Sequence, residues 1–245
     1  MKKISLFIIA LNSILASQAQ TQFFGKVNVE FEKTTNVHAL YKDMEPEWFE
    51  RIKERLPKTV LSYHNFIGDS TKSIYKPGRE VEVDPKTWYR PVADKNVVFT
   101  DFKTGRTIAQ KPVYEETFLM EDSVSKIKWK LTADTRVIAG YECRKAVGIL
   151  NDTIGLFAFY TDEIMISGGP EGIQGLPGMI LGLGIPRLHA TWFATKVDVF
   201  DINMNSVTPA TKGKKVSRTT MMQSLDKVLR QWGEYGSKLI VNFAI

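Results

Sequence analysis

Apolar and polar residues alternate along residues 24–33. Val27, Val29 and Phe31 fall on one side of an extended backbone, and charged or amide residues fall on the other. Side chains of a β-strand point alternately to its two faces, so this pattern predicts a half-buried strand. Residues 59–76 then predict a hairpin, because two stretches rich in β-branched and aromatic residues flank a Gly-Asp-Ser turn.

Two other segments repeat their apolar residues every three or four positions, which is the spacing of one face of an α-helix. In residues 45–56 this face consists of Trp48, Ile52 and Leu56. In residues 218–232 it consists of methionine, leucine and tryptophan side chains. We therefore predict a short amphipathic helix in the N-terminal part of the chain and an amphipathic helix near the C-terminus.

The middle of the chain holds a series of short stretches rich in β-branched and aromatic residues. Their close spacing leaves room only for turns between them, which predicts antiparallel neighbours. No shift in composition marks a second domain, so residues 20–245 are expected to form a single domain. We predict a mainly β fold with a few helices (α+β), built on a single antiparallel, strongly curved or half-barrel sheet. Its further strands are expected at residues 96–101, 106–110, 113–120, 126–132, 136–150, 153–161 and 188–200.

The first residues have the order of a secretory signal peptide. Two lysines precede an apolar run over residues 4–15, which small residues at Ser17 and Ala19 end. A charged start, an apolar middle and a small-residue end are typical of such a signal, although a buried N-terminal helix is an alternative. We expect residues 1–19 to be removed and the mature chain to begin near Gln20. The mature protein would then be soluble in the periplasm without a lipid anchor, and secretion beyond the outer membrane stays open.

The charge of the chain argues against a nucleic-acid partner. It carries 33 lysine and arginine residues against 27 aspartate and glutamate residues. The net charge of +6 falls to about +4 once the two lysines of the signal are removed. Nucleic-acid binding proteins gather basic residues on one face, whereas here only residues 212–218 form a basic run. We interpret that run as a solvated linker.

The residues present argue against a transmembrane helix and against several cofactor classes. No apolar run approaches the roughly 20 residues that a transmembrane helix needs. Cys143 is the single cysteine, so it forms neither an intramolecular disulfide nor a multi-thiolate metal site. His38, His64 and His189 occur singly, without the spacing of metal ligands. We expect no metal and no cofactor.

The glycine-rich segment of residues 168–183 is the least ordinary part of the chain. Its glycine triplets are too few for a collagen helix. It lacks the GxxxxGK[ST] pattern of a phosphate loop, and Gly182 and Gly184 do not open a dinucleotide-binding helix. Pro177 and Gly178 instead predict a type II turn, with glycine at the position that requires positive φ.

Several blocks of this region resemble one known family. Residues 175–180 read Gly-Leu-Pro-Gly-Met-Ile, and further blocks lie at residues 129–132, 138–146, 159–164 and 168–170. With these blocks the chain resembles the GLPGLI family, a group of uncharacterised exported proteins of Bacteroidota-type bacteria. One departure is Phe159, where members often carry tryptophan.

The resemblance implies a location and a kind of partner. The family is associated with cell envelopes and with outer-membrane transport components, so an outer-membrane transporter or another envelope protein is an expected partner. The motif loop would be either structural or partner-binding, and the turn chemistry favours a structural role. The residues of this motif loop are Gly168, Gly169, Pro170, Gly175, Leu176, Pro177 and Gly178.

Two functions of different classes follow. The preferred one is a non-catalytic binding or accessory protein that takes a partner or an apolar ligand on its aromatic side chains. The alternative is a hydrolase that uses Cys143 or an acidic pair assembled by the fold. Such a pair must come from residues distant in the sequence, because the side chains of neighbouring residues such as Glu115 and Glu116 point to opposite strand faces. The candidate binding residues are Trp88 and Tyr89, in an irregular loop, and Phe157, Phe159 and Trp192 on strands.

Overall fold

The computed structural model describes residues 24–82 and 93–245. The expected signal peptide therefore lies outside the described residues, as do two of the predicted binding residues, Trp88 and Tyr89. The described part is mostly β, as the sequence predicted, and its strands join one sheet.

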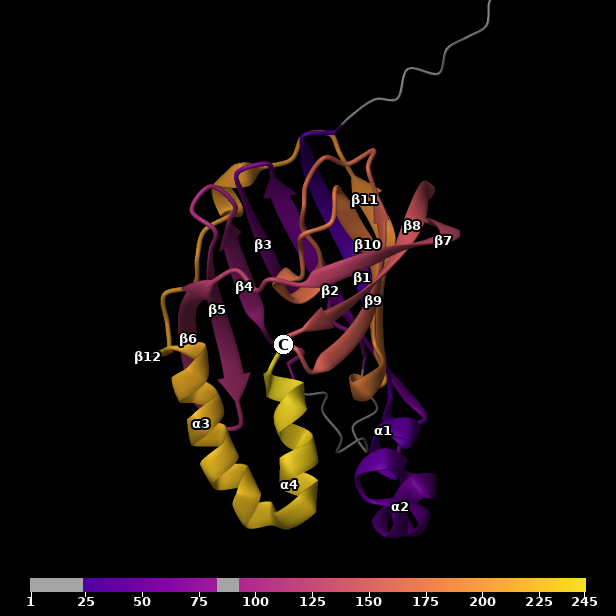
Figure 1. Ribbon diagram of the computed structural model, residues 1–245, viewed down its shortest axis with the longest axis vertical. Helices are drawn as coiled ribbons and strands as arrows, with labels where there is room; N and C mark the ends of the chain where they lie inside the picture. Colours follow the sequence, from indigo (N-terminus) through magenta and orange to yellow (C-terminus); the bar gives the residue numbers. More distant parts are fainter. Residues whose placement is uncertain (1–23, 83–92) are drawn as a thin grey trace, which may run out of the picture.

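The sheet has twelve strands in the order β12-β6-β5-β4-β3-β2-β1-β11-β10-β9-β8-β7, and it does not close. Figure 1 shows it curving, with β4, β5 and β6 on one side and β7, β8 and β9 on the other. The strands are β1 (Lys26–Asn36), β2 (Thr59–Asp69), β3 (Lys72–Pro77), β4 (Val97–Asp101), β5 (Arg106–Val113), β6 (Glu116–Ser123), β7 (Lys128–Ile138), β8 (Tyr141–Leu150), β9 (Ile154–Thr161), β10 (Met179–Ile185), β11 (Ala190–Asp198) and β12 (Lys214–Val216).

The sheet is mixed, so the prediction of an antiparallel sheet was wrong in one place. β12 runs parallel to β6, with Lys215 opposite Leu119. A hairpin forces two strands to be antiparallel, but β12 reaches this edge through a long connection from β11, near the middle of the sheet. The direction of β12 is therefore set by that connection and not by a turn.

Four α-helices lie near one end of the sheet (Figure 1). The predicted N-terminal helix is α2 (Pro46–Ile52), and α1 (Val37–Met44) precedes it without having been predicted. The predicted C-terminal helix is α3 (Arg218–Leu229), which α4 (Gly233–Leu239) follows. Short 3-10 turns lie at residues 53–55, 170–172, 186–188, 204–206, 230–232 and 240–243.

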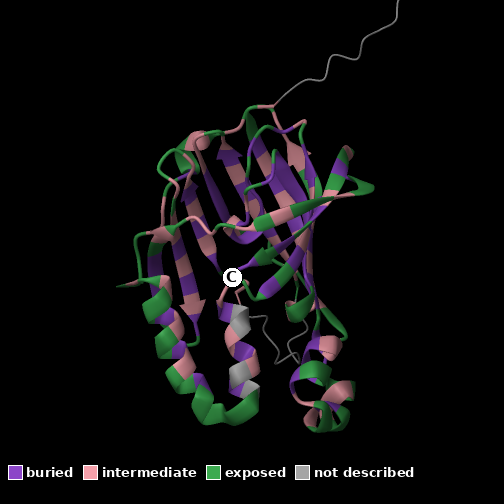
Figure 2. Ribbon diagram, viewed as in Figure 1, coloured by how far each residue is buried: buried purple, intermediate pink, exposed green. Residues whose placement is uncertain are grey.

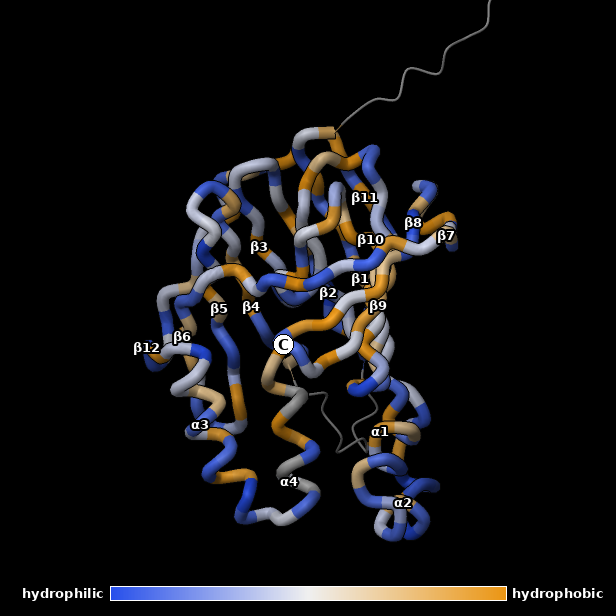
Figure 3. The backbone as a smooth tube through the Cα atoms, in the orientation of Figure 1, coloured by the Kyte–Doolittle hydropathy of each residue, from blue (hydrophilic) through white to orange (hydrophobic). Residues whose placement is uncertain are grey.

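The core lies between the inner face of the curved sheet, the segment that joins β9 to β10, and the helices. Val27, Val29 and Phe31 of β1 are completely buried, as their alternation predicted. Buried residues concentrate on the strands (Figure 2), while hydrophilic and hydrophobic residues both occur along the helices (Figure 3). Every residue of β10 is buried. This strand was not predicted, because a strand covered on both faces shows no alternation.

Candidate functional site

The motif loop, residues 168–178, is fastened to the sheet by main-chain hydrogen bonds. Ile180 N donates to Gly168 O at 2.9 Å. Gly178 has the predicted positive φ, at 149°, and a Cβ there would lie 2.0 Å from the main-chain oxygen of Thr161. The predicted type II turn is absent, because Gly178 N donates to Leu176 O at 2.8 Å and so closes a tighter turn. Glycine is required here by close backbone approach.

On its inner side the loop carries Glu171 to the concave face of the sheet. This side chain is only 7% exposed, and its backbone has a positive φ of 55°. Oε2 accepts a hydrogen bond of 3.0 Å from Asn96 Nδ2, while Oε1 is buried without a hydrogen-bond partner within the described chain. Sequence reasoning missed Glu171, because a buried charge has no periodic signature. We call its surroundings the inner polar cluster: Lys33, His64, Tyr75, Asp94, Asn96, Lys111, Glu171 and Trp192.

Aromatic rings and one ion pair hold one half of this cluster together. Lys33 Nζ lies 2.6 Å from Asp94 Oδ1 and 5.3 Å from the ring centroid of Trp192. Trp192 Nε1 donates to the Tyr75 hydroxyl at 3.0 Å. The Tyr75 ring stacks on His64 with centroids 5.1 Å apart. Trp192, predicted as a binding residue, is thus 1% exposed and committed to the core.

Burial sets the protonation of the cluster. It lowers the pKa of His64, which stays neutral near pH 7. His64 Nε2 lies 3.1 Å from the Asp94 main-chain oxygen, which can only accept, so the ring proton is on Nε2. Burial, together with the charge of Glu171, raises the pKa of Tyr75 well above its ordinary value. Tyr75 is therefore a neutral phenol at physiological pH.

Lys111 is the charge that faces Glu171. It is 4% exposed, and burial lowers the pKa of its ammonium to about 8, although the nearby charge of Glu171 acts in the opposite direction. A cavity of about 30 Å³ is lined by Lys111, Glu171, Thr107 and Arg218, among others. Such a volume holds one water molecule. The arrangement of a carboxylate, an amide and an ammonium is suited to anchoring the motif loop.

On its outer side the motif loop borders an open groove of about 680 Å³, which we call the motif groove. Trp129 Nε1 donates to the main-chain oxygen of Gln174 at 3.0 Å, and Gly175 N donates to Ser167 Oγ at 3.1 Å. These two hydrogen bonds hold the part of the motif loop that lines the groove. They use main-chain atoms of Gln174 and Gly175, so the Gln174 side chain has no hydrogen-bond partner among the described residues. The groove is lined by Ser70, Phe102, Gly105, Ser123, Val124, Ser125, Lys126, Ile127, Met165, Ser167, Gln174 and Gly175.

The remaining predicted aromatics, Phe157 and Phe159, lie on the outer face of β9, so they do not share a surface with Trp192. Their ring centroids are 6.1 Å apart, and Phe159 lies 6.5 Å from Phe193. The rings cover a glycine of the neighbouring strand, since a Cβ at Gly184 would lie 2.1 Å from the Phe157 ring. They have a packing role there.

Cys143 is completely buried. Its thiol lies 3.6 Å from the Tyr141 main-chain oxygen, and burial raises its pKa to about 12. A nucleophilic cysteine needs a lowered pKa and an adjacent base, so this thiol is not activated. Within the described chain, no group of three or more His, Cys, Asp or Glu side chains could hold a metal ion, and no helix is long and apolar enough to cross a membrane.

Comparisons with known proteins give one family match from the sequence and a fold match from solved structures. A sequence model described as "N-glycanase peptide, N-terminal domain" matches residues 103–231, which is more than half of the chain. Two solved structures of PNGF-II, in space groups P21 and C2, each superpose with a TM-score of 0.52 at 16% identity over 86% of this chain. The chain spans only 34% and 33% of their lengths, so this similarity describes the fold alone. No curated protein matches significantly. By the sequence match, the chain belongs to the family of N-glycanase peptide N-terminal domains.

Proposed function

We propose that this chain is a non-catalytic recognition domain of the cell envelope that binds the glycan part of a glycoconjugate in the motif groove. The family name connects it with an N-glycanase, a protein that acts on glycans. The signal-peptide pattern of residues 1–19 supports export. The resemblance to the GLPGLI family, with an envelope protein as partner, is compatible with the same location.

The composition of the motif groove is the observation that carries this proposal. Four serines and the Gln174 amide offer donors and acceptors, while Phe102 and Met165 offer apolar surface. A sugar presents the same combination, with hydroxyl groups at its edges and C–H groups on its faces. The volume of about 680 Å³ lies within the range of small-molecule sites.

The same lining supports a role without catalysis. Among the described residues that line the groove there is no Asp, Glu, His or Cys. Glycoside hydrolysis ordinarily uses two carboxyl groups that flank the bond. The described lining of the groove therefore offers contacts for recognition but not the pair of carboxyl groups that glycoside hydrolysis uses.

A hydrolase remains the second candidate, because Asp94 and Glu171 of the inner polar cluster are a candidate acidic pair. The charges of Asp94 and Glu171 both act on His64 and Tyr75. Asp94 is engaged by Lys33 and Glu171 by Asn96, which favours a structural use of both carboxylates. Release of free glycan from a glycopeptide, measured by mass spectrometry, would support this candidate and would contradict the first.

The direct test is calorimetric titration of the mature chain with N-linked glycopeptides and with the matching free glycans. Gln174→Ala removes a side-chain amide and leaves the main-chain bond to Trp129 in place. Loss of one uncharged hydrogen bond corresponds to an affinity about five- to tenfold weaker. Gln223→Ala, on the exposed face of α3, is the matched control and should leave affinity unchanged. No binding by the wild type, or equal weakening by both variants, would overturn the proposal.

A further inference from the structure

The basic run at residues 212–218, interpreted from the sequence as a solvated linker, is partly structured. Lys214 Nζ lies 2.9 Å from Glu116, and Arg218 Nε lies 3.6 Å from Asp122. Lys215 differs from both, because its side chain has no hydrogen-bond or ion-pair partner among the described residues. The charges of Lys215 and of Lys212 are thus both left uncompensated within the described part of the chain.

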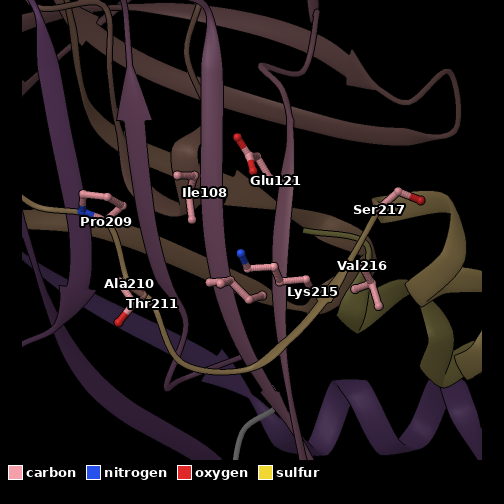
Figure 4. Close-up of a pocket in the computed structure, with 9 residues that line it drawn as sticks. Ile108, Glu121, Pro209, Ala210, Thr211, Lys215, Val216 and Ser217 are labelled. Atoms are coloured by element: carbon pink, nitrogen blue, oxygen red, sulfur yellow. The ribbon is translucent and has the colours of Figure 1, made fainter.

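The segment that carries Lys215 lies over the outer face of β5 and β6. Gln110 Nε2 donates to Lys212 O at 2.8 Å, and Lys72 Nζ donates to Val207 O at 3.0 Å. Between segment 207–217 and the strands is a pocket of about 480 Å³, which we call the β12 pocket (Figure 4). It is lined by Ile108, Leu119, Glu121, Pro209, Ala210, Thr211, Lys215, Val216 and Ser217.

Most of this lining is apolar. Leu119 is only 7% exposed although it belongs to the outer face, because the segment covers it. The carboxylate in the lining, Glu121, is paired with Arg106. In Figure 4 the Lys215 side chain extends from β12 across β6, with its ammonium toward Ile108. The β12 pocket therefore combines an apolar wall with one unpaired cation.

We propose that the β12 pocket binds a fatty acid, with the aliphatic chain against Ile108 and Leu119 and the carboxylate at Lys215. The apolar walls favour a chain over a sugar or a phosphate, because burying apolar area is what stabilises such a complex. One uncompensated ammonium matches one carboxylate. The volume of about 480 Å³ is within the range of ligand sites. This site is separate from the motif groove, so the two proposals fail independently.

The test uses decanoate below its micellar concentration and follows the methyl NMR signals of Ile108, Leu119 and Val216 in the mature chain. We expect saturable shifts of these methyls. Lys215→Gln should weaken decanoate binding about two- to fivefold, as expected for a partly exposed charge pair, and should leave binding of the neutral decanol unchanged. Lys214→Gln is the matched control, and it should change neither affinity.

A second variant tests the pocket without changing charge. Ala210→Phe places a ring in the lining and should abolish the shifts for both decanoate and decanol, provided that thermal unfolding shows an intact fold. The proposal is overturned if the three methyls do not respond, if the two lysine variants behave alike, or if wild type binds decanol as tightly as decanoate. Binding of a peptide or of another partner at this pocket without decanoate binding would also overturn it.

Discussion

Removal of the Glu171 carboxylate should destabilise the fold through two separable effects. Glu171→Ala leaves Asn96 Nδ2 without its 3.0 Å acceptor, and it leaves Lys111 buried without the opposing charge. An unsatisfied buried donor costs about 1–3 kcal/mol. Loss of the charge lowers the Lys111 pKa below about 8, and each pKa unit corresponds to about 1.4 kcal/mol. We expect a total of about 2–4 kcal/mol.

The size of the second effect is limited by the lysine itself. Its pKa is already about 8, so Lys111 can release its proton near neutral pH instead of remaining buried as a cation. This is why we expect a smaller loss than the roughly 3–5 kcal/mol typical of breaking a buried ion pair.

Glu171→Gln separates hydrogen bonding from charge. The amide oxygen of glutamine can still accept from Asn96, so this variant should lose only the charge effect, about half of the total. Urea unfolding of both variants at pH 7, monitored by tryptophan fluorescence, provides the measurement. If Glu171→Ala unfolds within about 0.5 kcal/mol of wild type, the carboxylate does not anchor the loop and the reasoning is refuted.

Three further predictions concern other positions. The pKa of Lys111 in the folded chain, about 8, lies below its ordinary value of 10.5, so the unfolded chain binds more protons between pH 8 and pH 10.5. The free energy of unfolding of the wild type should therefore rise by about 3 kcal/mol as the pH increases across this window. Lys111→Met should lose that rise when urea unfolding is measured over the same alkaline pH range. Gly178→Ala should cost more than about 3 kcal/mol because its Cβ meets a neighbouring main-chain oxygen, whereas Gly155→Ala, with open space, should be near neutral in the same unfolding assay. Expression of the full chain should yield a periplasmic protein that begins at Gln20, and N-terminal sequencing that finds residues 1–19 retained would contradict the signal peptide.

Local patterns in the sequence determined much of the fold. The alternation of residues 24–33 became β1, and the hairpin predicted at residues 59–76 became β2 and β3. The helical spacing of residues 45–56 and 218–232 became α2 and α3. These predictions succeeded because side-chain direction repeats every two residues in a strand and every 3.6 residues in a helix.

The tertiary structure decided which distant residues meet. Periodicity does not reveal that β12 joins β6 in parallel, or that the motif loop turns Glu171 inward toward Lys111. It also does not reveal that Trp192 packs inside while Phe157 covers the outer face. Sheet order depends on the path of long connections, and a buried polar cluster depends on partners far apart in the chain. The sequence by itself therefore determined the elements, whereas long-range packing decided the candidate sites.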